Sequence, residues 1–546
     1  MIIRSTFWRD NTGLWAALVV GLTLKAVLLA LDVFPFNADE AVVALMARHI
    51  LQGERPVFFY GQAYLGSADA WLIAVAFLIF GEHVIAIRIA QSVLYLGTLF
   101  TTYWLGRKIY QDHWVATAAA LLLALPTVLV TLYTTATLGG YGETLLIGNI
   151  LLLWTLRLRD STAMDTLRRL EWLVFGALAG FGFWTFGLLG VYLLPIGAAL
   201  FFRSNDLREN LRALLSANYS LAALGFVGGS SPWWWATVFG AATVSELGGS
   251  AIAESMPGGP IAAMGLRLFS LIVLGLPVIV GLRPPWAVRW LGLPLAPLAL
   301  VIFLGTVGWA IKMCRTHGPT RLLAGVCLIV CGAFVATPFG NDPSGRYFLP
   351  LIPPLALFIA GTLNRVRREY PRLALGLLFG LLGFNLWGNL DSAFTFPPGI
   401  STQFDRVAQV DQRDMPEVIE FLRSQGEIRG YGNYWVSFPM AFLSGEQLIF
   451  TAALPYHEDF RYTPRDNRYA PYREMVMASD RVAYLTTNHP TLNDYLRAQF
   501  RQKGISFEEK AIGDFRIFYS LSRRVTPEEL GIYEQAPDDT PPATPR

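Results

Sequence analysis

Charged side chains are scarce in this sequence. Asp, Glu, Lys and Arg make up only 15% of its 546 residues, while apolar residues reach 53%. A typical soluble domain carries about 25% charged residues, so a purely soluble globular protein is excluded. The net charge of +3 and the lack of a basic tract also argue against a protein that binds nucleic acid.

Cysteine is nearly absent as well. The three cysteines, Cys314, Cys327 and Cys331, all lie in the apolar part of the chain. No further Cys or His stands at ligand spacing from them, so the pattern favours packing over a metal site. Disulfides do not hold the C-terminal region together, because it has no cysteine. The sequence indicates no cofactor, and it leaves dependence on a divalent metal open.

Long apolar stretches dominate up to about residue 392. A helix needs about 20 apolar residues to cross ~30 Å of hydrocarbon. The first stretch is followed by no small-residue cleavage site, so it is predicted to be a retained span. We expect a polytopic α-helical membrane protein with about 11–13 transmembrane helices. Stretches that reach or approach the required length lie at 14–35, 84–106, 114–133, 141–157, 172–187, 188–202, 213–235, 265–282, 293–312, 321–339, 347–363 and 372–392.

Basic residues predict the orientation in the cell membrane, because Lys and Arg are retained on the cytoplasmic side. Arg4 and Arg9 place the N-terminus inside, so the segment 37–83 emerges outside. Later arginines place the region after residue 392 outside too. Twelve spans would instead return the C-terminus to the inside. Either one stretch is re-entrant or the count is off by one, and the topology of 236–320 stays open.

A shorter apolar segment at 66–81 is predicted to lie in the membrane plane as an interfacial helix. The membrane domain therefore covers 1–392, and its outer loop 37–83 carries interfacial helices. After about residue 393 charged residues return, and short strand-like and helix-like stretches alternate. This alternation predicts a small soluble α/β domain at 393–533, outside the cell, and the Pro-rich 534–546 reads as a disordered tail. Strands are expected at 434–438, 447–451, 481–486 and 515–521, and helices at 415–425 and 490–503.

The densest candidate site follows the first span. Asn37 is a good helix N-cap, Glu40 stands at the reciprocal position of a capping box, and Asp39 is favoured by the helix dipole. A catalytic interpretation is also open. Two neighbouring carboxylates at the bilayer edge could meet a lipid-linked phosphate and an acceptor from water. A helix N-terminus would keep Asp39 available as a proton acceptor.

Other polar groups gather in outer loops. Gln62 and Tyr64 lie in a turn that suits contact with a saccharide, or equally an aromatic turn at the interface. Glu143, at the start of a later span, needs water or a partner, since a carboxylate in hydrocarbon is costly. Arg346 and Tyr347, at the outer edge of another span, could bind a lipid phosphate or anchor the helix.

Together these features resemble the GT-C superfamily of membrane glycosyltransferases. Within it, the chain looks most like bacterial relatives of the protein O-mannosyltransferases and of the lipid A aminoarabinose transferases. The resemblance covers about 1–390 and rests on the first span, the Asp39-Glu40 pair that opens an interfacial helix, the second interfacial helix and Arg346-Tyr347-Phe348-Leu349-Pro350.

The resemblance implies transfer of a sugar from a polyprenyl-phosphate carrier to an extracytoplasmic lipid, glycan or protein. It implies Asp39 as the acceptor-activating base with Glu40 as its neighbour, and Tyr347 and Arg346 near the carrier phosphate. One departure puts phosphate contacts through the first loop in question. The aminoarabinose transferases carry a lysine in the second interfacial helix region, where this chain has Gln62.

Two other classes of function stay open. A transporter or flippase of lipid-linked sugars would need ionisable residues deep in its spans, or broken helices in paired halves. Lys25 is the main such residue, and the chain shows no internal repeat. A non-catalytic membrane anchor would explain the C-terminal domain, but it leaves the acidic and aromatic groups of the outer loops unexplained.

Overall fold

The computed structural model describes residues 11–160, 166–204, 206–250, 259–395 and 399–535. Within them, seven helices are long and apolar enough to cross a membrane, which agrees with a multi-pass membrane protein. The basic residues at 4 and 9 and most of the predicted tail lie outside the described residues. Candidate spanning helices are Thr12–Ala30, Val84–Tyr110, Gly259–Ile279, Leu293–Thr316, Gly318–Ala336, Arg346–Glu369 and Pro371–Thr395.

The membrane part is built almost entirely of helices, because its apolar stretches can satisfy their backbone hydrogen bonds internally only in that form. Its helices are α2 (Thr12–Ala30), α5 (Val84–Tyr110), α6 (His113–Ala124), α7 (Val128–Tyr133), α8 (Tyr141–Asp160), α9 (Thr166–Thr185), η1 (Gly187–Leu189), α10 (Gly190–Phe201), α11 (Leu207–Leu214), α12 (Ala217–Gly229), α13 (Ser231–Val238), α14 (Thr243–Leu247), α15 (Gly259–Ser270), η2 (Leu271–Gly275), α16 (Leu276–Ile279), η3 (Leu293–Leu295), α17 (Ala296–Thr316), α18 (Gly318–Ala336), η4 (Pro338–Asn341), η5 (Arg346–Leu351), α19 (Ile352–Glu369) and α20 (Pro371–Thr395).

The stretch predicted as one span at 114–133 is two helices, and the prediction of a continuous helix there was wrong. Pro126 cannot donate a backbone hydrogen bond, so the chain breaks between α6 and α7. Side chains of α20 satisfy the freed carbonyls: Asn385 donates to Leu125 and Asn389 donates to Pro126, each at 2.8 Å.

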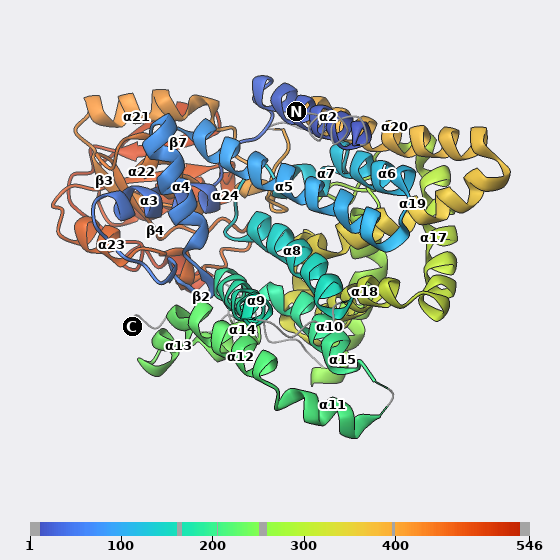
Figure 1. Ribbon diagram of the computed structural model, residues 1–546. Helices are drawn as coiled ribbons and strands as arrows, with labels where there is room; N and C mark the ends of the chain where they lie inside the picture. The colour runs from blue at the N-terminus through green and yellow to red at the C-terminus, as the bar shows by residue number, and fades with distance from the viewer. Residues whose placement is uncertain (1–10, 161–165, 205, 251–258, 396–398, 536–546) are drawn as a thin grey trace.

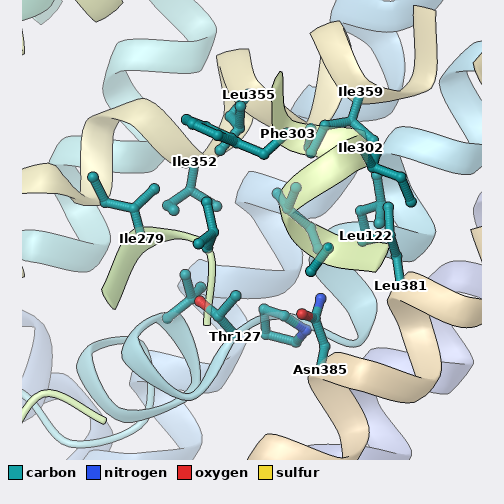
Figure 2. Close-up of a pocket in the computed structure, with 16 residues that line it drawn as sticks. Leu122, Thr127, Ile279, Ile302, Phe303, Ile352, Leu355, Ile359, Leu381 and Asn385 are labelled. Carbon is teal, nitrogen blue, oxygen red and sulfur yellow. The ribbon is translucent and has the colours of Figure 1, made fainter. Parts of the chain in front are cut away.

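Beside this break lies an apolar cavity of about 590 Å³ among α6, α7, α16, α17, α19 and α20. Figure 2 shows Thr127 and Asn385 on one side of it and apolar side chains, including Phe303, around the rest. Its lining carries no charged residue.

The segment after the first span forms a compact unit of its own. Helix α3 (Ala38–Leu51) is followed by the antiparallel strands β1 (Phe58–Phe59) and β2 (Gln62–Gly66), then by the apolar helix α4 (Ala68–Phe80). The turn predicted at Gln62 and Tyr64 is therefore a hairpin. A β-bridge from Leu65 to Phe186 ties this hairpin to the end of α9.

The C-terminal region forms a five-stranded mixed sheet flanked by helices, which confirms the α/β prediction. The strand order is β4-β3-β5-β7-β6, with β3 parallel to β4 and β5, and with β7 antiparallel to β5 and β6. Its elements are η6 (Arg406–Ala408), η7 (Gln412–Asp414), α21 (Met415–Ser424), β3 (Arg429–Gly432), α22 (Tyr434–Leu443), β4 (Ile449–Ala452), η8 (Pro464–Asp466), α23 (Ala470–Met477), β5 (Ala483–Thr487), α24 (Pro490–Gln502), β6 (Glu508–Ile512), β7 (Phe515–Tyr519) and η9 (Ile532–Gln535).

The strand predicted at 434–438 was wrong, because this segment is the start of α22. Asn433 caps that helix by accepting a hydrogen bond from the Trp435 amide at 3.0 Å. The aromatic run had suggested a strand, but every side chain from Tyr434 to Phe442 is buried, as in a helix enclosed on all sides.

Helix α22 packs directly against α3, so the C-terminal domain rests on the segment 37–83. In Figure 1 the orange and red sheet lies at one end of the molecule with the blue α3 and α4 beside it, and α17 lies at the other end. One continuous hydrophobic core runs from the membrane helices into the facing side of the C-terminal domain. A smaller second core lies within the domain itself.

Candidate active site

The predicted cap of α3 is present. The Asn37 side chain accepts a hydrogen bond from the Glu40 amide at 3.0 Å, so the helix begins at the predicted place. Asp39 and Glu40 both fall in its first turn. Successive residues of a helix point about 100° apart, so the two carboxylates face different surroundings.

Glu40 faces the protein interior and is fully buried. The Arg88 guanidinium, on α5, donates from Nε to Oε1 and from Nη2 to Oε2, each at 3.2 Å. Arg88 also donates to the Phe34 carbonyl at 2.9 Å. The Asn37 amide interacts with the Glu40 carboxylate as the capping box predicted, but Arg88 is its main partner. This geometry favours a structural role for Glu40 over the expected catalytic one.

Asp39 is only partly buried and faces the C-terminal domain. The Tyr434 hydroxyl, at the start of α22, donates a hydrogen bond to Asp39 Oδ1 at 2.6 Å. No other hydrogen bond to this carboxylate is present in the described part of the chain. Asp39 is therefore oriented through one oxygen, and the other is available for a reacting group.

Gln62 lies against Arg468, which in turn stacks on Tyr434. With its amide oxygen turned toward the guanidinium, Gln62 accepts from Nη1 and Nη2 at 2.9 and 3.0 Å. The Arg468 Cζ atom lies 5.3 Å from the centre of the Tyr434 ring. Asp39, Tyr434, Arg468 and Gln62 thus form one polar cluster, which we call the Asp39 cluster. Half of it comes from the C-terminal domain.

Arg346 and Tyr347 begin η5, directly after a sharp turn at Gly345. Gly345 has φ = +83°, and a Cβ there would approach Val278 Cγ1 to 2.4 Å, so the turn requires glycine. Arg346 forms an ion pair with Asp342 at 2.7 Å, and its Cζ lies 5.2 Å from the Tyr347 ring centre.

Tyr64 connects this pair to the Asp39 cluster. Burial raises the pKa of Tyr64, while the charges of Arg346 and Arg468 act in the opposite direction. Tyr64 is therefore within electrostatic reach of both guanidiniums. Of the substrate-contact residues predicted from the sequence, the structure therefore brings Gln62, Tyr64, Arg346 and Tyr347 into one region next to Asp39.

Tyr64 and Tyr347 also line an apolar cavity of about 610 Å³ that extends between α10 and α18. Apart from these two hydroxyls and Thr337, its lining is apolar, and Phe186, Val191, Leu247, Val330, Phe334 and Phe339 belong to it. Arg346 adjoins this apolar cavity through Tyr347, because its Cζ lies 5.2 Å from the centre of the Tyr347 ring. Such a surface suits an amphiphile with an anionic head and an apolar chain.

Glu143 has a different environment from the other predicted contacts. It is buried at the start of α8, where it interacts with Asp69 of α4. Asp69 in turn accepts from Gln91 at 2.8 Å and from Thr137. In the described residues no contact links Glu143 to Asp39 or Arg346. The neighbour that the structure places near this carboxyl is thus another carboxyl, that of Asp69.

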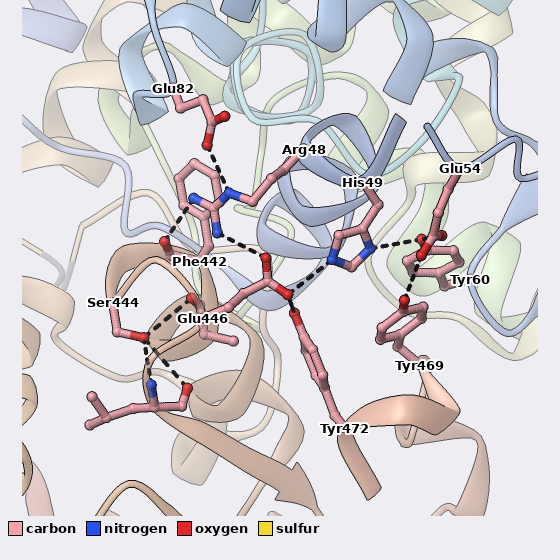
Figure 3. A network of polar contacts seen from close by, with 12 residues as sticks. Arg48, His49, Glu54, Tyr60, Glu82, Phe442, Ser444, Glu446, Tyr469 and Tyr472 are labelled. Carbon is pink, nitrogen blue, oxygen red and sulfur yellow. Dashed lines mark hydrogen bonds and ion pairs between the residues drawn. The ribbon is translucent and has the colours of Figure 1, made fainter. Parts of the chain in front are cut away.

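A second polar network joins α3 to the C-terminal domain (Figure 3). His49 contacts Glu446 at 3.0 Å and Tyr60 at 2.9 Å, and Tyr472 donates to Glu446 at 2.7 Å. Burial opposes ionisation of Glu446, but the hydrogen bonds from His49 and Tyr472 and the nearby charge of Arg48 outweigh it and lower its pKa to about 2. This network fixes the domain on the segment that contains α3.

Sequence reasoning missed the residues that the C-terminal domain contributes, Tyr434 and Arg468. They lie in a region that carries no recognisable motif, and no spacing connects them to Asp39. Within the described ranges, no three Asp, Glu, His or Cys side chains are grouped to hold a metal ion.

Comparison with known proteins agrees with this architecture. Residues 68–235 match the dolichyl-phosphate-mannose-protein mannosyltransferase family. A solved structure of ArnT from Cupriavidus metallidurans bound to undecaprenyl phosphate superposes with a TM-score of 0.61, covering 92% of this chain and 98% of that one at 14% identity. The chain has the fold of the GT-C superfamily. The archaeal oligosaccharyltransferase AglB from Archaeoglobus fulgidus shares it, with a TM-score of 0.52 and 14% identity over 88% of this chain and 69% of AglB.

Sequence similarity points the same way within this GT-C fold. The undecaprenyl phosphate-alpha-4-amino-4-deoxy-L-arabinose arabinosyl transferase 1 of Pseudomonas fluorescens is 26% identical over 330 residues, 58% of this chain. The match covers 54% of that relative, so the chain spans about half the length of the curated relatives it matches.

Proposed function

We propose that this protein is a membrane glycosyltransferase that moves a sugar from a polyprenyl-phosphate carrier to an acceptor on the outer side of the membrane. The observation that carries the proposal is the junction at Tyr64. There an apolar cavity of about 610 Å³ is lined by a tyrosine that the charges of Arg346, Arg468 and Asp39 all reach. A lipid-linked sugar needs this combination, because its chain is apolar, its phosphate is anionic and its reacting carbon adjoins the phosphate.

In the proposed reaction Asp39 is the general base. Its free oxygen takes the proton of the acceptor hydroxyl or amine while that atom forms a bond to the anomeric carbon of the sugar. The bond from the anomeric carbon to the phosphate oxygen breaks, and the carrier phosphate leaves with the electron pair. Arg346, next to Tyr347, is placed to stabilise the charge that develops on the phosphate. Tyr434 orients Asp39 by its hydrogen bond.

The relatives support the choice of donor. The arabinosyl transferase is named for an undecaprenyl phosphate donor, and ArnT was solved with undecaprenyl phosphate bound. Each observation belongs to that protein, and the donor of this chain is inferred from the cavity and the adjoining guanidinium of Arg346.

The two other functions have less support. A transporter would use an ionisable group within the spans, but the Lys25 ammonium donates to the Thr134 carbonyl and the Thr135 hydroxyl, each at 2.7 Å, and to the Thr134 hydroxyl at 3.1 Å. All three N–H donors of the Lys25 ammonium are thus used in hydrogen bonds within the protein. A passive anchor would not need the C-terminal domain to hold Asp39 through Tyr434.

Reconstituting the purified protein in liposomes with a radiolabelled polyprenyl-phosphate sugar separates the three functions. A glycosyltransferase releases free carrier phosphate and transfers label to an acceptor in a membrane extract. A flippase moves the labelled lipid between leaflets with the sugar still attached. An anchor does neither. Failure to release carrier phosphate with any of several sugars and acceptor extracts would refute the proposal.

A further inference from the structure

Arg468 is unlike the other arginines near the site. It lies between β4 and α23 of the C-terminal domain, and its guanidinium reaches Gln62 of the first outer loop. In the described part of the chain no carboxylate oxygen lies within 4.0 Å of its nitrogens. Its Nε is buried and has no hydrogen-bond partner there.

Nearby arginines, in contrast, have direct partners. Arg346 pairs with Asp342 at 2.7 Å, and Arg465 pairs with Glu246 at 2.8 Å. Glu246 also accepts from the amide of Ala63 in the β1-β2 hairpin. Through Glu246, Arg465 therefore links the loop that carries Arg468 to the hairpin that carries Gln62. Arg465 therefore has a docking role that its contacts explain, while Arg468 has no direct ion pair in the described residues and is reached only at longer range by the charges of Asp466 and Asp39.

The surroundings of Arg468 favour binding of an anion. A buried guanidinium without a direct counter-ion is costly, and a charge-assisted hydrogen bond to phosphate would offset that cost. Asp466 is close enough to interact with Arg468, but burial raises the pKa of Asp466 to about 7, so near neutral pH it is only partly ionised. Tyr64, at the mouth of the apolar cavity, is reached by the charges of both Arg468 and Arg346.

We propose that Arg468 of the C-terminal domain binds the phosphate of the lipid-linked donor, opposite Arg346 and beside Asp39. This inference rests on the proposed function and extends it. The C-terminal domain becomes part of the donor site, and its cation lies where the first loop presents the uncharged Gln62. Lys at this position would keep the charge but lose the planar fork of donors, so Arg468→Lys should restore binding only in part.

The test measures binding of undecaprenyl phosphate, without a sugar, to the full-length protein in nanodiscs. We expect Arg468→Gln to raise its Kd about ten- to a hundredfold, the loss typical of one charge-assisted hydrogen bond. Binding of the matching polyprenol, which lacks the phosphate, should be unchanged in the same variant. Inorganic phosphate should compete weakly, because it cannot use the apolar cavity.

Arg465→Gln is the matched control, since it removes a cation three residues away that already has a partner. It should leave the Kd for undecaprenyl phosphate near the wild-type value, and melting temperatures should verify that both variants stay folded. Equal binding by wild type and Arg468→Gln would overturn the inference, and so would equal losses in the two variants or a parallel loss of polyprenol binding. Wild-type protein that binds no undecaprenyl phosphate would instead refute the proposed donor itself.

Discussion

Replacing Asp39 by asparagine and, separately, Glu40 by glutamine distinguishes a catalytic role from a structural role at two adjacent residues. Asparagine keeps the shape of Asp39 and its Oδ1 still accepts from Tyr434, so we expect little change in folding. The variant cannot accept a proton. General-base catalysis contributes about 10² to 10⁴ in rate, so turnover should fall by that factor while the melting temperature stays close to that of the wild type.

Glu40→Gln should have the opposite result. Glu40 is fully buried and pairs with Arg88. Losing the charge of Glu40 therefore leaves a buried guanidinium without a counter-ion. Breaking a buried pair in this way costs about 3–5 kcal/mol. The lower end is expected here, because the Phe34 carbonyl and the new amide oxygen still accept from Arg88. Turnover per folded molecule should change much less than in the Asp39 variant.

The assay is the rate of sugar transfer at saturating donor, measured beside melting temperature for the same detergent-purified samples. Near-normal turnover in Asp39→Asn would refute the assignment of the base. Normal stability in Glu40→Gln would refute the structural role of the buried pair. Severe and equal losses of turnover in both variants, at normal stability, would mean that the two carboxylates act together.

Three other predictions test the site, the domain contact and the topology. Arg346→Ala should raise the KM for the donor about ten- to a hundredfold and change the KM for the acceptor much less; an unchanged donor KM would make Arg346 a membrane anchor. The pKa of Glu446 is lowered from about 4.5 to about 2, so its ionised form stabilises the fold above about pH 4.5, and this contribution is lost as the pH falls toward 2. Melting temperatures from pH 6 to pH 2 should therefore fall less steeply for Glu446→Gln than for wild type, and equal slopes would contradict the role of the His49 contact. Single cysteines at the exposed positions Gln52 and Asn488 should both react with a membrane-impermeant thiol reagent in intact cells, in a background without the native cysteines Cys314, Cys327 and Cys331; labelling of Asn488 only after lysis would refute an extracytoplasmic C-terminal domain.

The sequence predicts those features that depend on local chemistry. Apolar length predicts most of the spanning helices, and Asn37 predicts the start of α3 to the residue. Alternation of short stretches predicts the C-terminal α/β domain, although the aromatic segment at Tyr434 was assigned to a strand. That error arises because a helix buried on every side loses the amphipathic period by which helices are recognised.

Contacts between distant segments could not be predicted in this way. The partner of Glu40 is 48 residues away on α5, and the partner of Asp39 is 395 residues away in the C-terminal domain. An arginine in an apolar span signals that a buried partner exists, so Arg88 could have been singled out as unusual. No comparable signal marks Tyr434 or Arg468, since both lie in the C-terminal α/β domain, where polar residues are ordinary.

The contact between Asp39 and Tyr434 also constrains the topology that the arginine pattern leaves open. Both residues must lie on the same side of the membrane, because their side chains form a direct hydrogen bond of 2.6 Å. If α2 crosses the bilayer once, the chain between α3 and the C-terminal domain must cross an even number of times. The total number of crossings is then odd, so twelve crossings are incompatible with the contact between Asp39 and Tyr434. The break at Pro126 and the unsettled region 236–320 are the places where one apolar stretch need not be one complete crossing.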